Sequence, residues 1–463
     1  MKKLLLRIAT GSLVVAACLS IIVALLINVF DMQIEVSGNG MYPIFTFGDP
    51  DDHYAALEAN RSNNPRLESI GSVVVNTDSA YWTDFRGPKR DGVYRASAIR
   101  TDWPGGGLEP LWVQPIGGGY ASFVVADSYA FTIEQRRNDE VVVAYNIDTG
   151  TEIWTYQWTT HFQEMMGGPG PRATPTLHDG RVYALGATGV FVCLDATTGE
   201  LIWDRNILTD SGARNLQWAM SASPLIVGDV VVVLPGGPHG WSVAAYDRQT
   251  GTIAWHVLDD ITGYTSPMLV TLGGVRQVIV VTAERIAGLN PKNGETLWDY
   301  PWRVSMVPSI AQPLIVNDTQ IFLSASYGKG SALLELTPDG ERFTASIVWE
   351  TNRMKNKFSS SVLVDGYIYG LDDAILACID AATGALMWKG GRYGYGQLLA
   401  ADDHLVVLTE QGDLVLVRAT PESHQEVAGF RAINGKTWNV PAMSKGLLLV
   451  RNSREMAAFD LSQ

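Results

Sequence analysis

Residues 193–203 read Cys193-Leu194-Asp195-Ala196-Thr197-Thr198-Gly199-Glu200-Leu201-Ile202-Trp203, with the Asp, the Gly and the Trp each four residues apart. An Asx side chain that bonds its own backbone, followed by a Gly that accepts positive φ, is typical of a tight turn between antiparallel strands. The same Asx, Gly and Trp spacing occurs five times in the chain, as Asn146/Gly150/Trp154, Asp195/Gly199/Trp203, Asp247/Gly251/Trp255, Asn290/Gly294/Trp298 and Asp380/Gly384/Trp388. The chain is therefore a tandem repeat, with a Trp on the strand after each turn.

The repeat period indicates the architecture. Successive Trp residues from 154 to 298 are 49, 52 and 43 residues apart, and the next interval hides a degenerate unit that ends at Trp349. That unit reaches its Trp nine residues after Gly340 instead of four, which predicts a longer hairpin. Each unit has β-rich apolar runs broken by turn signals, enough for four strands. Units of about 40 to 50 residues with four strands are typical of β-propeller blades around a central channel.

The two ends of the repeat region complete each other. Trp112 resembles the last strand of a unit that has no earlier strands, whereas residues 442–460 supply three strands without a Trp strand after them. Phe430 stands where the seventh unit would place its Trp. We therefore predict an all-β, eight-bladed propeller over residues 81–463, made of four-stranded antiparallel blades. The N- and C-terminal strands close the ring and leave no unpaired edge, and seven blades are the alternative.

The N-terminal region is a separate feature. Lys2, Lys3 and Arg7 precede an apolar run from Ile8 to Phe30, which would span roughly 34 Å as a helix. Basic residues before this run and acidic residues after it orient the N-terminus inside. We predict a cytoplasmic tail (1–7), one transmembrane helix (8–30) and a linker or stalk (31–80). The propeller would then face the periplasm from the inner membrane.

Two other interpretations of the N-terminal region stay open. One is a cleaved signal peptide, although its apolar core would be shorter and would end in a small-residue site. The other is a bacterial lipoprotein, because Val15-Ala16-Ala17-Cys18 fits a cleavage box that would leave a lipidated Cys18. The apolar run continues beyond Cys18, which favours the membrane helix.

Charge, cysteine and histidine content indicate which partners and bound groups to expect. The chain has 48 Asp and Glu against 34 Lys and Arg, so nucleic acid is a disfavoured partner. Cys193 and Cys378 occupy the same strand position in two distant units, which predicts small buried core residues without a disulfide. The seven His show no metal-ligand spacing, and no Cys-x-x-Cys-His haem site occurs. We therefore expect no metal site.

The best candidate binding site is one mouth of the central funnel. Residues just before the first strand of each unit would gather there, and they are Tyr120, Arg172, Trp218, Tyr264, Lys357, Tyr395, Trp438 and Asn439. Aromatic, cationic and amide groups in one ring suit a flat anionic or polyhydroxylated ligand. The structural alternative is that Arg172, Lys357 and Arg392 neutralise buried carbonyls while the aromatic rings fill the channel.

The motif at 193–203 resembles the pyrroloquinoline-quinone-like (PQQ-like) propeller repeat, over residues 109–460. Residues 82–92 and 435–441 look like the PQQ-binding-like bacterial branch of that superfamily. The resemblance implies two possible classes. Quinoprotein dehydrogenases hold the quinone on calcium beside a catalytic Asp and a disulfide between adjacent cysteines, whereas BamB-like scaffold proteins are non-catalytic propellers.

The sequence departs from the dehydrogenase pattern. No two cysteines are adjacent, and the acidic pairs Asp372-Asp373 and Asp402-Asp403 lie in predicted hairpin turns rather than in a calcium site. We therefore expect a non-catalytic binding or scaffold protein without a cofactor, whose partner is an envelope protein or a small polar ligand. The alternative is a PQQ- and calcium-dependent dehydrogenase.

Overall fold

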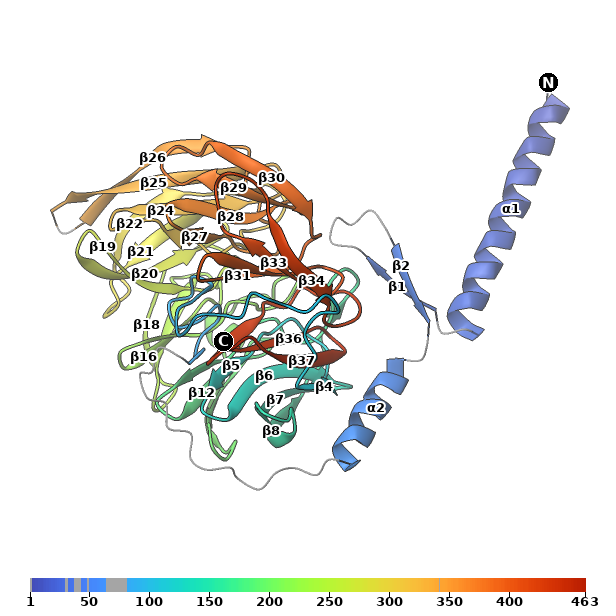
Figure 1. The fold of residues 1–463 in the computed structure, drawn as a ribbon, viewed down its shortest axis with the longest axis horizontal. Helices are drawn as coiled ribbons and strands as arrows, with labels where there is room; N and C mark the ends of the chain where they lie inside the picture. Colours follow the sequence, from blue (N-terminus) through green and yellow to red (C-terminus); the bar gives the residue numbers. More distant parts are fainter. Residues whose placement is uncertain (1, 30–31, 37–42, 48–49, 64–80, 341) are drawn as a thin grey trace.

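The computed structural model describes residues 2–29, 32–36, 43–47, 50–63, 81–340 and 342–463 (Figure 1). Within these residues the chain forms an eight-bladed β-propeller, as the sequence predicted. Each blade is a sheet of four antiparallel strands, and blade 7 has a fifth strand at its inner edge.

The strands of each blade follow one another along the chain, from the inner strand to the outer one. Blades 1 to 4 are β5–β8 (Val124–Ala126, Tyr129–Arg136, Asp139–Asn146, Glu152–Thr159), β11–β14 (Thr176–His178, Arg181–Leu185, Val190–Asp195, Leu201–Asn206), β15–β18 (Leu225–Val227, Val230–Val233, Val243–Asp247, Ile253–Val257) and β19–β22 (Met268–Leu272, Val275–Val281, Arg285–Leu289, Thr296–Pro301). Blades 5 to 7 are β23–β26 (Leu314–Ile315, Gln320–Ala325, Gly330–Asp339, Arg342–Thr351), β27–β30 (Val362–Val364, Tyr367–Asp372, Ile375–Asp380, Leu386–Arg392) and β31–β34 (Gln397–Ala401, His404–Leu408, Asp413–Arg418, Glu426–Arg431). The short elements β9 (Gln163–Glu164), β10 (Gly168–Pro169) and α3 (Ile207–Ser211) lie between blades.

Blade 8 closes the ring with strands from both ends of the propeller. It consists of β35 (Ala442–Ser444), β36 (Leu447–Arg451), β37 (Glu455–Asp460) and β4 (Trp112–Pro115). Trp112 pairs with Ala458 in the antiparallel β37–β4 ladder. The predicted closure is therefore confirmed. The fifth strand of blade 7, β3 (Val93–Tyr94), pairs in parallel with β31.

The repeat motif works as the sequence predicted. In blade 2, the carboxylate of Asp195 accepts hydrogen bonds from the backbone N–H groups of Thr197 and Thr198, both at 2.9 Å. Gly199 has φ +76°, a left-handed conformation that favours glycine. The Trp154 indole of blade 1 reaches across and donates to the carbonyl of Ala196 at 3.0 Å. Trp112, Trp203, Trp349 and Trp388 likewise donate to a carbonyl of the next blade, whereas Trp298 donates to Gln277 within its own blade.

Blade 5 lacks this turn and has the longer hairpin predicted for it. Its β25 and β26 are ten residues long each, and their tip leans over β22 of blade 4. Phe343 on that tip is buried in the hydrophobic cluster that blades 4 and 5 share. The degenerate unit therefore covers the outer edge of its neighbour.

The hydrophobic core consists of layers between neighbouring blades. Between blades 2 and 3, for example, Phe191 and Trp203 pack with Val231 and Tyr246. Cys193 lies in the same layer and, like Cys378 of blade 6, is buried with a free thiol whose pKa burial raises to about 12. Both cysteines are therefore core residues, as predicted.

The N-terminal region contains α1 (Lys2–Val29), a hairpin of β1 (Met32–Val36) and β2 (Pro43–Phe47), and α2 (Pro50–Asn63). Among the residues described, no helix reaches the length and apolar character of a membrane span, so the predicted transmembrane helix over 8–30 is not supported. Of the predicted linker, residues 37–42, 48–49 and 64–80 lie outside the described residues, as does residue 31. Residues 58–63 belong to α2, which lies beside β4 (Figure 1).

Candidate functional site

The predicted site residues lie on loops that join the outer strand of one blade to the inner strand of the next. All of them are half-buried except Asn439, which is fully buried. The structure brings them together in two contact groups, one large and one small.

The larger group is a continuous line of rings. Tyr120 stacks on Trp438, with ring centroids 5.4 Å apart. Phe358 lies 4.6 Å from Trp438, and Tyr395 lies 5.8 Å from Phe358. At the other end of the line, the guanidinium of Arg172 lies 5.6 Å from the Tyr120 ring. Four loops that are far apart in sequence therefore form one aromatic surface.

Lys357 is held among three rings, two of which belong to this line. Its ammonium lies 4.7 Å from the centroid of Tyr395, 5.2 Å from that of Phe358 and 5.3 Å from that of Tyr327. Such contacts attract a cation electrostatically. Burial lowers the pKa of Lys357. Phe358 and Tyr327 were not predicted as site residues, although Phe358 is adjacent to Lys357. Tyr327 follows β24 at a position without a repeat signal.

The smaller group consists of Trp218 and Tyr264. Their ring centroids are 5.9 Å apart, and the backbone N–H of Trp218 donates to the Tyr264 hydroxyl at 3.4 Å. Burial raises the pKa of Tyr264, and the nearby Arg172 opposes this shift. The two groups therefore share one electrostatic environment.

Glu410 braces the larger group from behind. One carboxylate oxygen accepts the indole N–H of Trp438 at 3.0 Å, and the other accepts the backbone N–H of Tyr395 at 3.2 Å. Asn439 lies deeper and donates to the carbonyls of Gly119 and Ala121 at 3.1 and 3.0 Å. Asn439 therefore ties blade 8 to blade 1 rather than facing the mouth.

The structural alternative assigned Arg172, Lys357 and Arg392 to the neutralisation of buried carbonyls. These three side chains lie in different places. Arg172 donates to the carbonyls of Gly168, at 2.9 Å, and Gly170. Burial lowers the pKa of its guanidinium. Arg392, in contrast, is exposed at the side of the propeller. Arg172 therefore bonds carbonyls of its own loop, and both of these bonds are only partly buried.

Two other arginines, not singled out from the sequence, fill the channel. The guanidinium of Arg90 donates to the carbonyls of Ser223, Pro224 and Pro267 and to the Thr176 hydroxyl. That of Arg86 donates to the carbonyls of Ser360, at 3.4 Å, and Ser361, at 2.8 Å. Both side chains are buried, and burial lowers the pKa of Arg86 to about 10.

The segment that carries these arginines enters from the end opposite the mouth. Trp82 bridges to Val125, and Thr83 accepts a hydrogen bond from the backbone of Leu177. Both contacts are in the middle of inner strands, whereas the predicted site residues precede the starts of those strands. Residues 82–92, which we name the plug segment, therefore lie in the channel below the predicted site residues.

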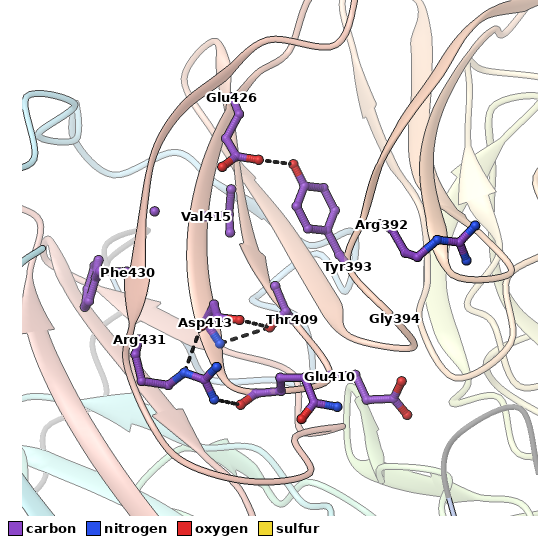
Figure 2. Close-up of a pocket in the computed structure, with 12 residues that line it drawn as sticks. Arg392, Tyr393, Gly394, Thr409, Glu410, Asp413, Val415, Glu426, Phe430 and Arg431 are labelled. Carbon is purple, nitrogen blue, oxygen red and sulfur yellow. Dashed lines mark hydrogen bonds and ion pairs between the residues drawn. The ribbon is translucent and has the colours of Figure 1, made fainter. Parts of the chain in front are cut away.

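A side pocket of about 420 Å³ opens between blades 6 and 7 (Figure 2). Its wall includes Glu410, so it lies directly behind the mouth. Inside, the Tyr393 hydroxyl bonds Glu426 at 2.9 Å, and Arg431 pairs with Asp413 at 2.8 Å. Most of the charged side chains that line the pocket are thus already paired within it.

The mouth does not offer the donors that calcium would need beside a quinone. In the described part of the chain, no three His, Cys, Asp or Glu side chains lie together as a divalent cation requires. The aromatic rings also contact one another rather than bordering a slot, since Tyr120 covers Trp438. The residues present therefore do not fit a calcium-bound PQQ.

Large apolar side chains are exposed on the same loops. Met165 between blades 1 and 2 is 81% exposed, Ile261 between blades 3 and 4 is 63% exposed, and Met306 between blades 4 and 5 is 76% exposed. All three lie on the loops between blades 1 and 5 that precede inner strands, and we name them the apolar rim. Exposed apolar side chains beside aromatic rings are typical of protein interaction sites.

Two known proteins are similar in sequence to parts of this chain. BamB from Moranella endobia is 25% identical over 259 residues, which cover 52% of this chain and 63% of the relative. The quinoprotein alcohol dehydrogenase PedH from Pseudomonas putida is 25% identical over 164 residues, or 34% of this chain and 26% of the enzyme. The chain thus spans less than two thirds of the length of these relatives.

A solved structure shows the same fold. BamB from Moraxella catarrhalis superposes with a TM-score of 0.56 at 15% identity, covering 77% of this chain and 98% of that one. The family model of the outer membrane protein assembly factor BamB matches residues 137–390, more than half of the chain. The chain therefore belongs to the BamB family of propeller proteins.

Proposed function

We propose that this chain is a non-catalytic binding or scaffold protein, and that the mouth of its propeller docks an envelope protein outside the cytoplasm. The observation that carries the proposal is the exposure of three large apolar side chains, Met165, Ile261 and Met306, on the same set of inter-blade loops as the aromatic groups. Binding energy at protein interfaces is concentrated in such apolar and aromatic anchors. The BamB relatives are outer membrane protein assembly factors, which supports an envelope partner.

The location rests on the sequence. The basic residues before the apolar run and the acidic residues after it support a propeller outside the cytoplasm. Protease added to intact spheroplasts tests this point. Cleavage of the propeller without lysis is the expected result, and full protection until lysis would contradict it.

A photo-crosslinking residue in place of Ile261 tests the docking face. The control is the same residue in place of Met387, an exposed apolar side chain on the outer strand β30. The proposal predicts adducts with one defined envelope protein from position 261 but not from 387. In the chain that carries the crosslinker at position 261, the double substitution Met165→Ser and Met306→Ser should abolish those adducts, and equal adducts from positions 261 and 387 would reject the mouth as the docking face.

A small polar ligand is the second candidate, favoured by the contact of Arg172 with Tyr120 and by the cage around Lys357. Titration with PQQ and calcium, monitored by absorbance and dye reduction, separates the alternatives. Saturable binding with turnover would favour the dehydrogenase class. Binding of a polar ligand without turnover, lost in Arg172→Ala and Trp438→Ala, would favour a ligand-binding propeller.

A further inference from the structure

The helix α2 (Pro50–Asn63) lies on the seam where blade 8 meets blade 1 (Figure 1). Leu57 is the apolar anchor of this contact and is only 2% exposed. Beside it, a ring nitrogen of His53 lies 2.9 Å from the carbonyl oxygen of Ile116, and Asn60 donates to the side chain of Gln114 at 3.0 Å. Both partners belong to β4 or follow it directly. One face of α2 therefore contacts the strand that closes the ring.

Arg61 at the end of α2 inserts into a buried charge cluster. It donates to Glu152 at 2.8 Å and to Glu134 at 3.2 Å, and both carboxylates are buried in blade 1. Burial opposes ionisation of Glu134, yet Arg136, Arg61 and Arg451 together lower its pKa to about 2. Glu134 is thus charged and attracts the helix. On the exposed side of the helix, Glu58 pairs with Arg137 at 2.9 Å.

The surface of blades 8 and 1 that α2 covers, which we name the groove, does not depend on α2 to stay folded. Without Arg61, Glu134 and Glu152 would still pair with Arg136, and Glu134 would still accept from the Tyr145 hydroxyl at 3.0 Å. Arg451 from blade 8 also faces this cluster. The carboxylates therefore remain compensated by residues of the propeller, so the helix can leave without exposing an unpaired buried charge.

We propose that α2 is a detachable strap, which binds this groove in cis and fixes the N-terminal segment to the seam between blades 8 and 1. The contact is small, because it consists mainly of one buried leucine and the ion pairs of Arg61. The helix can therefore leave the groove without unfolding the propeller. Release would separate α2, and with it the hairpin of β1 and β2, from the seam between blades 8 and 1. The strap would thus control how far the propeller reaches from its N-terminal segment.

Hydrogen exchange of the full-length chain, read on peptides that cover 50–63 and on peptides from β4 and β37, tests the strap. At about 50 mM NaCl we expect residues 50–63 to be protected, and at about 1 M NaCl we expect exchange there to rise about tenfold. Arg61→Ala should raise exchange at low salt, whereas Asp52→Asn, an exposed change on the same helix, should not. Exchange in β4 and β37 should stay unchanged throughout.

Two results would overturn the strap. If residues 50–63 exchange at low salt as fast as an unstructured peptide, the helix does not dock. If β4 and β37 lose protection together with α2, the helix is an integral part of ring closure.

A cysteine pair, Asn60→Cys with Gln114→Cys in a Cys18→Ser background, provides a second readout. Intramolecular crosslinking supports docking in cis, whereas crosslinked dimers would show that α2 binds a second copy and would reject the strap.

Discussion

Gly199 in the turn of blade 2 lies directly on the indole ring of Trp154 in blade 1. A Cβ atom on this glycine would be 2.6 Å from Cε3 of the ring, closer than Cβ atoms approach their neighbours in proteins. The same relation joins Gly150 to Trp112, Gly251 to Trp203, Gly294 to Trp255 and Gly384 to Trp349. The four-residue spacing of Asx, Gly and Trp therefore reflects a turn within one blade and also a contact between neighbouring blades.

We predict that Gly199→Ala destabilises the propeller by at least about 2 kcal/mol, because the left-handed backbone and the clash with Trp154 add to each other. Gly228→Ala is the matched control. Gly228 also has positive φ, +58°, but no other residue lies within 4 Å of where its Cβ atom would be, so the cost should be about 1 kcal/mol. Urea unfolding of both variants measures the difference, and equal losses would mean that the Trp contact contributes nothing.

Ring closure gives the second prediction. Trp112 is buried and donates to the carbonyl of Ile147 in blade 1 at 2.8 Å. Trp112→Ala should cost about 3 to 5 kcal/mol and raise hydrogen exchange in β37 before the other blades. Leu111→Ala, which changes an exposed neighbour, should have little effect. If Trp112→Ala left exchange in β37 unchanged, the closing strand would not limit the stability of the ring.

Much of this fold could be predicted because each repeat leaves a local signal. The Asx turn, the positive φ of Gly199 and the Trp on the next strand are all encoded within eleven residues, and they recur. The blade count followed from Trp112 and the C-terminal strands, since an incomplete sheet needs a partner.

The site was harder to predict because its contacts cross between blades. The sequence placed Tyr120 and Trp438 at one mouth but could not show that they stack, nor that Glu410 holds Trp438 from behind. The plug segment was visible only as a resemblance, because no local pattern reports that an arginine bonds carbonyls of distant blades. The docking of α2 rests on Leu57, Arg61 and Glu58, which lie in a stretch whose composition is typical of a tether.

The plug segment gives the third prediction. Arg86→Met would leave the carbonyls of Ser360 and Ser361 without their donor in the channel, and should cost about 2 to 4 kcal/mol. Arg392→Met removes an exposed arginine and serves as the control. Thermal unfolding of both variants tests the prediction. If Arg86→Met were as stable as Arg392→Met, the plug segment would not hold the blades together.

The last prediction concerns pH. Glu140 on β7 is buried between blades 1 and 2, where its carboxyl accepts the backbone N–H of Ala187 at 2.9 Å and the indole N–H of Trp158 at 3.1 Å. Burial raises its pKa from 4.5 to about 7, against these hydrogen bonds and against Arg172. The folded state therefore holds a proton that the unfolded state releases between these pH values.

Because the folded pKa of Glu140 is the higher one, its contribution to stability is complete below about pH 4.5 and is lost as pH rises through about 7. Between pH 5 and pH 8 this group should lower the free energy of unfolding by up to about 3 kcal/mol. Glu140→Gln cannot titrate and removes this slope, although its amide would face the Trp158 donor and change stability at every pH. The quantity to measure is thus the difference between the pH slopes of the two proteins, by urea unfolding at several pH values. Parallel slopes would show that Glu140 titrates with an ordinary pKa in the folded protein.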